Sequence, residues 1–106
     1  MKKYSLKNYK RGWIIGNFEP AIYKTDAFET AVKKYQKGDT EKAHYHKITR
    51  EYTVIISGRF RVNGTIIDTG DIIEIGTEEI CNFECIETGD TLVVKVPSVK
   101  EDKYLL

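Results

Sequence analysis

The sequence has few of the residues that mark a disulfide-stapled or membrane-spanning chain. Its 106 residues include two cysteines, two prolines, two histidines and one methionine. The longest unbroken aliphatic or aromatic runs have three residues, as in Val54-Ile55-Ile56, far too few for a helix that crosses a bilayer. No apolar stretch follows the N-terminal lysines, so the start of the chain does not resemble a signal peptide. We therefore expect no membrane partner and a cytoplasmic, reducing setting.

Charge of neither sign dominates. The chain has 17 Lys and Arg against 16 Asp and Glu, for a formal net charge of +1 at pH 7. This balance argues against a nucleic-acid partner or a basic membrane-binding patch. The length fits one domain, residues 1–106, which is large enough to form a hydrophobic core without disulfide bonds or a structural metal. The basic segment 1–10 is expected to be loosely ordered.

Short apolar segments separated by turn residues predict an all-β fold. The breaks fall about 6–13 residues apart, which is typical of a sandwich or barrel rather than of β–α–β units. Asn63-Gly64 is the strongest hairpin signal because both positions tolerate positive φ. Pro97 ends the last segment because proline cannot donate to a strand ladder. The predicted strands are 13–15, 52–56, 59–62, 65–67, 72–75, 80–86 and 91–96.

One segment has a helical pattern instead. Phe28, Ala31, Val32 and Tyr35 are spaced as i, i+3, i+4 and i+7, which is typical of an amphipathic helix. Thr25 or Asp26 would cap the start of such a helix, and Gly38 would end it. Periodicity alone therefore predicts a helix over 25–35, against the all-β pattern elsewhere.

The only two histidines, His44 and His46, are two positions apart. On a strand they would share a face, and two adjacent imidazoles can bind one cation. Glu51 follows in the next apolar segment, and a hairpin would bring its carboxylate toward the same point. Two imidazoles and one carboxylate form the ligand set of a catalytic zinc or non-haem iron site with open positions. A His-x-His pair alone is a weak signal, and two surface or part-buried histidines are the plain alternative.

The spacing around this pair is more specific. Gly38, His44, His46, Glu51 and Gly58 follow the order Gly, five residues, His, one residue, His, four residues, Glu, six residues, Gly. This pattern resembles the first signature motif of the cupin superfamily. The resemblance implies a double-stranded β-helix, or jelly roll, of two antiparallel sheets, with a pocket between them and a metal at its mouth. It also implies that residues 28–37 form a strand, against the helical periodicity.

If this segment is a strand, its alternation leaves two choices for the interior. Either Glu29, Lys33 and Tyr35 or Thr30, Lys34 and Gln36 face inward, and periodicity does not choose between them.

The second cupin motif matches only at its start. Gly70-Asp71 opens it, but Cys81 stands where the family has a third histidine. Alternation places Cys81 and Cys85 on one face of the strand, too far apart for a disulfide. If Cys81 takes the place of the histidine, it faces His44, His46 and Glu51 as a thiolate, which binds Zn²⁺, Fe²⁺ or Cu⁺ well. Three alternatives stay open: Cys81 as a fourth ligand, a metal completed by water, and histidines that hold no metal.

The resemblance implies three kinds of function. The first is an enzyme, such as an isomerase or dioxygenase, with a divalent transition metal (Zn, Fe, Ni or Mn) on His44, His46, Glu51 and Cys81. Its substrate would be a small polar, carbohydrate-like molecule, with Glu51 as ligand or base. The second is a metal-free sugar epimerase in which histidine and tyrosine move protons. The third is a non-catalytic cupin that binds or senses a small molecule. Homodimers are common among cupins, and one is expected here.

Overall fold

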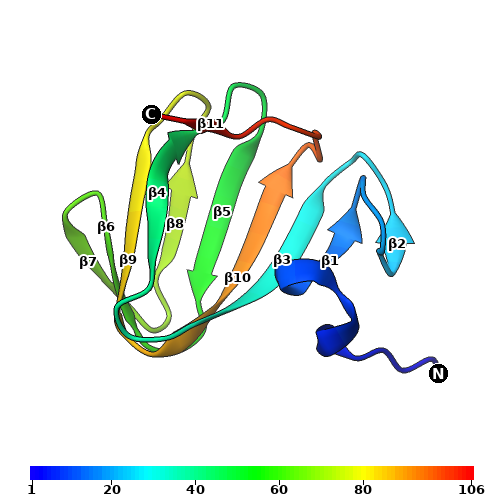
Figure 1. The fold of residues 1–106 in the computed structure, drawn as a ribbon, viewed down its shortest axis with the longest axis horizontal. Helices are drawn as coiled ribbons and strands as arrows, with labels where there is room; N and C mark the ends of the chain where they lie inside the picture. Colours follow the sequence, from blue (N-terminus) through cyan, green and yellow to red (C-terminus); the bar gives the residue numbers. More distant parts are fainter.

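Eleven short strands make up most of the chain in the computed structural model, which describes residues 1–106 (Figure 1). They are β1 Trp13–Gly16, β2 Tyr23–Lys24, β3 Glu29–Tyr35, β4 Thr40–Tyr45, β5 Arg50–Ile55, β6 Arg59–Val62, β7 Thr65–Asp68, β8 Ile72–Ile75, β9 Cys81–Glu87, β10 Gly89–Val96 and β11 Tyr104–Leu105. One sheet has the order β2-β1-β3-β10-β5-β8, and the other β11-β4-β9-β6-β7. The two sheets face each other, and the all-β jelly roll expected from the sequence is confirmed.

The seven segments predicted as strands correspond to β1 and to β5 through β10. Their ends differ from the predicted ones by at most two residues. The hairpin between β6 and β7 turns at Asn63 and Gly64, with φ of 50° and 80°. Both residues adopt the positive φ that a two-residue hairpin turn of this kind requires, as predicted.

The helix indicated by periodicity over 25–35 is wrong. Residues Glu29–Tyr35 form β3, which pairs with β10 along its whole length and with β1 at its start. A helix here would leave the backbone donors and acceptors of β10 without partners on one side. Sheet pairing therefore overrides the local spacing, as the family resemblance implied.

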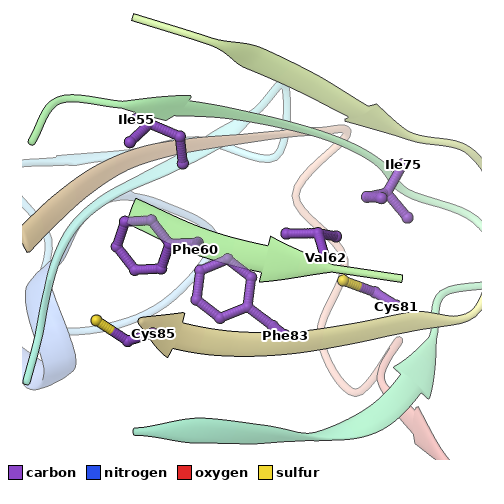
Figure 2. Close-up of a cluster of buried hydrophobic side chains, with 7 residues drawn as sticks. All are labelled: Ile55, Phe60, Val62, Ile75, Cys81, Phe83 and Cys85. Atoms are coloured by element: carbon purple, nitrogen blue, oxygen red, sulfur yellow. The ribbon is translucent and has the colours of Figure 1, made fainter. Parts of the chain in front are cut away.

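The apolar core fills one half of the space between the sheets. Phe60 and Val62 of β6 and Phe83 of β9 pack against Ile55 and Ile75 of the opposite sheet (Figure 2). Burial of each such side chain contributes roughly 1.5–3 kcal/mol to folding. Figure 2 also shows the two cysteines of β9 at opposite ends of the cluster, with the sulfur of Cys81 near Val62. Both cysteines are buried and free, so the predicted alternation along β9 and the absence of a disulfide are confirmed.

The C-terminal segment forms hydrogen bonds with the loop between β4 and β5, which begins at His46. The buried carboxylate of Asp102 accepts backbone N–H bonds from Lys47, Ile48 and Thr49 at 3.1, 3.0 and 2.8 Å. Strand β11 then pairs with β4 beside His44. The loop between β4 and β5 is therefore held by bonds to other parts of the chain: those to Asp102, and one from the backbone N–H of Glu78 to the carbonyl of His46 at 2.6 Å.

The N-terminal segment forms two single turns of 3-10 helix, η1 (Leu6–Asn8) and η2 (Lys10–Gly12). Figure 1 shows them beside β1 and β3. Gly12 lies against the backbone carbonyl of Val32, in a space too small for a Cβ. None of the helical turns has the length and apolar character needed to span a membrane.

Candidate functional site

The other half of the space between the sheets is a polar cavity. His44 of β4, Glu51 of β5 and Cys81 of β9 all line it, together with Lys95 of β10. Its volume is about 40 Å³, which holds a few waters or one small chemical group rather than a whole ligand. Three of the four predicted site residues therefore share one cavity.

The two histidines lie side by side at the edge of this cavity. Both are buried, with 4% and 3% of their surface exposed, and their ring centroids are 5.3 Å apart in an edge-to-face arrangement. His44 directs Nδ1 at the carbonyl of Lys42, 2.8 Å away. This contact assigns the proton to Nδ1 and leaves the lone pair of His44 on Nε2.

Glu51 belongs to a charged row that crosses the six-stranded sheet. Lys95 lies opposite Glu51 on one side and opposite Glu29 on the other, so one ammonium stands between two carboxylates. The Thr53 hydroxyl donates to Oε2 of Glu51 at 3.0 Å, and Nζ of Lys95 lies 3.9 Å from Oε1. Ser98 donates to Glu29 at 3.1 Å. Both carboxylates are therefore partnered.

Lys95 was not singled out from the sequence, yet it connects the predicted residues. Its Nζ lies 3.4 Å from Nε2 of His46 and 5.0 Å from the centre of the Trp13 ring. Burial and the positive charge of Lys95, with a further contribution from His44, lower the pKa of His46 to about 4. His46 is therefore neutral near pH 7, and its Nε2 accepts a hydrogen bond from the ammonium.

Cys81 lies directly opposite His44 on the neighbouring strand. This register places Cys81 beside His44, and its role as a ligand stays a prediction. Burial raises the pKa of the Cys81 thiol to about 12, and the nearby carboxylates of Glu51 and Glu41 add to the effect. Without a metal ion, Cys81 carries a proton and no charge.

The chemistry of this donor set fits a divalent metal, but its arrangement does not. No group of three or more His, Cys, Asp or Glu side chains is placed to hold a metal ion. The ammonium of Lys95 instead lies within reach of both His46 and Glu51. The ligand set His44, His46, Glu51 and Cys81 stays a prediction, to which the structure adds a competing cation.

A second, half-buried polar cluster closes the cavity on the β3 side. The Tyr35 hydroxyl donates to Oε1 of Glu41 at 2.8 Å, and Nζ of Lys33 lies 3.8 Å from the same oxygen. Burial and the Glu41 carboxylate raise the pKa of Tyr35 well above its usual range. Although burial acts in the opposite direction, Lys33 and the Tyr35 hydroxyl lower the pKa of Glu41. The structure thus places the set Glu29, Lys33 and Tyr35 inward, a choice that periodicity left open.

The mouth of the cavity has an excess of positive charge. A pocket of about 270 Å³ adjoins the inner cavity and shares Trp13, Lys33, Lys95 and Lys103 with it. We call this pocket the mouth. Its cationic side chains are Arg11, Lys33, Lys95, Lys100 and Lys103, and its acidic ones are Glu29, Glu101 and Asp102. Glu29 and Asp102 accept hydrogen bonds within the protein, and Lys33 and Lys95 are paired with Glu41 and Glu51. The cations of the mouth that take part in no ion pair are Arg11, Lys100 and Lys103.

Comparison with known proteins identifies the fold. No family model and no curated protein matches the chain. A solved protein with a double-stranded β-helix domain from Klebsiella pneumoniae superposes with a TM-score of 0.73 at 19% identity, over 98% of this chain and 90% of that one. An RmlC-like cupin from Shewanella frigidimarina superposes with a TM-score of 0.65 at 18% identity, over 74% and 72%.

The fold is that of the cupins.

A third structure shows that this fold also occurs with a bound metal. The bacterial pirin YhhW from Escherichia coli, solved in complex with nickel(II), superposes with a TM-score of 0.68 at 14% identity. The match covers 83% of this chain but 39% of the pirin chain. At such low identities the comparisons establish the cupin fold of this chain and leave its ligand to the chemistry of the cavity.

Proposed function

We propose that this cupin-fold chain is a binding protein for a small, polar, negatively charged molecule, such as a carbohydrate-like carboxylate or phosphate. The observation that carries the proposal is the position of Lys95. Its side chain is 15% exposed, and its ammonium is fixed at the junction of the inner cavity and the mouth. Because Lys95 lines both pockets, a carboxylate or phosphate that enters the mouth reaches this cation before it reaches Glu41 and Glu51 of the inner cavity.

Charge counting supports an anionic ligand. In the inner cavity Glu51 is paired with Lys95, and Glu41 with Lys33. His46 is neutral and Cys81 is protonated at pH 7. These two ion pairs are therefore balanced without a metal ion. Lys103, which lines both the inner cavity and the mouth, is an additional cation, as are Arg11 and Lys100 of the mouth. An incoming anion would share the Lys95 ammonium with Glu51 and would gain further charge-assisted hydrogen bonds from Arg11, Lys100 and Lys103, the mouth cations that take part in no ion pair.

The sizes of the two pockets fit a ligand that has a sugar-sized part and one charged functional group. The mouth, at about 270 Å³, accommodates a sugar-sized molecule, whereas the inner cavity, at about 40 Å³, accommodates one functional group. Trp13 lines both pockets and gives the ligand an apolar wall. This geometry favours a small carbohydrate-like anion over a bare inorganic ion.

The state of Tyr35 favours binding over the metal-free epimerase hypothesis. That hypothesis needs a tyrosine that releases a proton readily at neutral pH. Tyr35 is the tyrosine of the inner cavity, and its hydroxyl donates to the Glu41 carboxylate. Because burial and Glu41 raise its pKa, Tyr35 is a poor acid. This is the reason that we rank the sensor or binding role above proton transfer.

A divalent metal on His44, His46, Glu51 and Cys81 is the second candidate, and one feature favours it. His44 has its Nδ1 held by a backbone carbonyl and its Nε2 free, as metal-binding histidines usually do, and Cys81 lies opposite. A metal there would supply a Lewis acid to a small ligand, with Glu51 as ligand or base. Lys95 would have to leave its place between His46 and Glu51, which is why we rank this candidate second.

Calorimetric titration tests the first candidate. The probes are glucuronate and glucose 6-phosphate, each with one anionic group, and uncharged glucose. We expect the wild type to bind both anions and not glucose, and Lys95→Met to lower anion affinity about tenfold or more. Lys37→Met, in an exposed turn, is the matched control and should bind as the wild type does. Equal binding of glucose, or unchanged binding by Lys95→Met, would contradict the proposal.

We also propose that the expected homodimer forms through the outer face of the six-stranded sheet. Thr53 and Val93 point inward, so their neighbours in β5 and β10 point outward, as does Ile72 of β8. These outward residues include Val54, Leu92, Val94 and Ile72, and Ile72 is 66% exposed. They form an apolar patch flanked by the Arg50–Glu74 and Lys34–Asp90 ion pairs, and an apolar patch with a charged rim favours self-association.

A further inference from the structure

The largest hollow of the molecule lies outside the barrel, where the N-terminal turns pass along β3. Its volume is about 700 Å³. We call it the N-terminal groove and define it by Lys7, Tyr9, Arg11, Lys33, Lys34 and Tyr35. The first three residues come from the N-terminal turns, and the others from the second half of β3. This groove brings together segments that are more than twenty residues apart in the chain.

The groove is strongly basic. Four cationic side chains line it, and Glu41 is its one carboxylate. Glu41 is already engaged by Lys33 and Tyr35, and Lys34 is paired with Asp90 across the sheet. Lys7 and Arg11 take part in none of the ion pairs of the protein. Two cations thus face the groove with no carboxylate of the chain to neutralise them.

Arg11 is held in an uncommon backbone conformation at this place. Its φ and ψ are 52° and 30°, in the left-handed region that non-glycine residues rarely adopt. Gly12 follows with φ of 80° and lies against the Val32 carbonyl. The backbone is therefore fixed on the edge of β3, and Arg11 lines both the groove and the mouth of the barrel.

The groove, the mouth and the inner cavity adjoin one another and share lining residues. Lys33 lines all three, and Tyr35 and Glu41 line the groove and the inner cavity. Arg11 lines both the mouth, where Lys95 lies, and the groove, where Lys7 lies, so these three cations belong to adjoining pockets.

We infer that the N-terminal groove is a second anion subsite of the same ligand. This inference rests on the proposed function and extends it: the ligand is an elongated molecule with two anionic groups, one bound at Lys95 in the mouth and the other at Arg11 and Lys7 in the groove. Carboxylates and phosphates share the chemistry that these cations recognise. A short acidic oligosaccharide and a sugar bisphosphate are the two sources that the experiment separates.

Titration calorimetry with paired probes tests the inference. Glucuronate and glucose 6-phosphate carry one anionic group, whereas digalacturonate and fructose 1,6-bisphosphate carry two. We expect the wild type to bind at least one of the two-group probes about tenfold or more tightly than its one-group counterpart. The variant Lys7→Gln, at a residue that lines the groove but not the mouth, should reduce this advantage several-fold and keep its affinity for the one-group probes. Lys10→Gln removes one charge from the neighbouring turn outside the groove and is the matched control.

The outcomes separate the two proposals. Binding of one-group probes with no advantage for either two-group probe overturns the groove subsite and leaves the proposed function standing. An advantage that survives unchanged in Lys7→Gln also overturns it. Failure of all four probes to bind the wild type overturns both. An advantage for digalacturonate alone assigns carboxylates as the ligand groups, and an advantage for the bisphosphate alone assigns phosphates. Thermal unfolding midpoints of the variants within a few degrees of the wild type show that the turns remain folded.

Discussion

Nζ of Lys95 lies 3.4 Å from Nε2 of His46, and the same ammonium lies 3.9 Å from the carboxylate of Glu51. A lysine therefore contacts two of the residues that the cupin motif marks as metal ligands. The partners of this cation are fixed by register, since Lys95 stands opposite Glu51 on the neighbouring strand. The cation at this position is thus part of the protein, and the proposed anion would bind it together with Arg11, Lys100 and Lys103, the mouth cations that take part in no ion pair.

The stability of the protein should fall between about pH 6.5 and pH 4 through His46. Its folded-state pKa of about 4 lies below the ordinary value of 6.5, so the unfolded chain takes up the proton first as the pH falls. The stabilising contribution is fully present above pH 6.5 and is lost toward pH 4, at a cost of about 2 kcal/mol. Urea unfolding at pH 7 and pH 4.5 measures it. His46→Gln should lose less stability than the wild type over this interval, and an equal loss would contradict the account.

Asp102→Ala should destabilise the protein by about 2–4 kcal/mol. The substitution leaves the backbone N–H groups of Lys47, Ile48 and Thr49 without their shared acceptor. Glu101→Ala is the control, since its exposed neighbouring carboxylate makes no such bonds. Urea unfolding measures both. A loss below about 0.5 kcal/mol for Asp102→Ala would mean that the loop after His46 does not depend on the C-terminal segment.

Replacement of Lys95 by an uncharged residue should allow a metal ion to bind at the predicted ligands, which are His44, His46, Glu51 and Cys81. We expect Lys95→Met to bind Co²⁺ at least about tenfold more tightly than the wild type, since the like charge beside His46 and Glu51 is gone. Cobalt absorption in the visible range reports binding, and an intense sulfur-to-cobalt charge-transfer band would report Cys81 as a ligand. Addition of Cys81→Ser should abolish that band and spare the fold. Equal cobalt affinity in the wild type and Lys95→Met would show that the ammonium does not compete.

A charge on the outer face of the six-stranded sheet should dissociate the proposed homodimer. Val94→Lys places an ammonium amid the outward residues of β5, β8 and β10, and its desolvation opposes association. Light scattering coupled to size exclusion should give a dimer mass for the wild type and a monomer mass for the variant. Lys100→Glu, outside that face, should remain dimeric. A monomeric wild type would refute the assembly.

Much of the fold could be read from the sequence, because turn residues and alternation mark strands directly. The Asn63-Gly64 hairpin and the inward set of β9 follow from local chemistry. Strand β3 shows the limit of this approach. Its spacing fits a helix, and only pairing with β1 and β10, distant in sequence, makes it a strand. The family resemblance supplied that information where periodicity could not.

The candidate site was predicted in part for the same reason. His44, Glu51 and Cys81 were found because they occupy motif positions, and they do share a cavity. Lys95 was missed because its role depends on cross-strand register, which one sequence does not display. Arg11 and Asp102 were missed because they lie in terminal segments without strong local patterns. Their roles arise only when those segments pack against β3 and the β4–β5 loop.

Elemental analysis of protein purified without chelators tests the central claim most directly. If the ammonium of Lys95 is the resident cation of the site, the wild type should carry well below one equivalent of transition metal per chain, and His44→Ala with His46→Ala should not change that content. Near-stoichiometric zinc, iron, nickel or manganese that disappears in the double variant would contradict the account and establish the metal centre in its place.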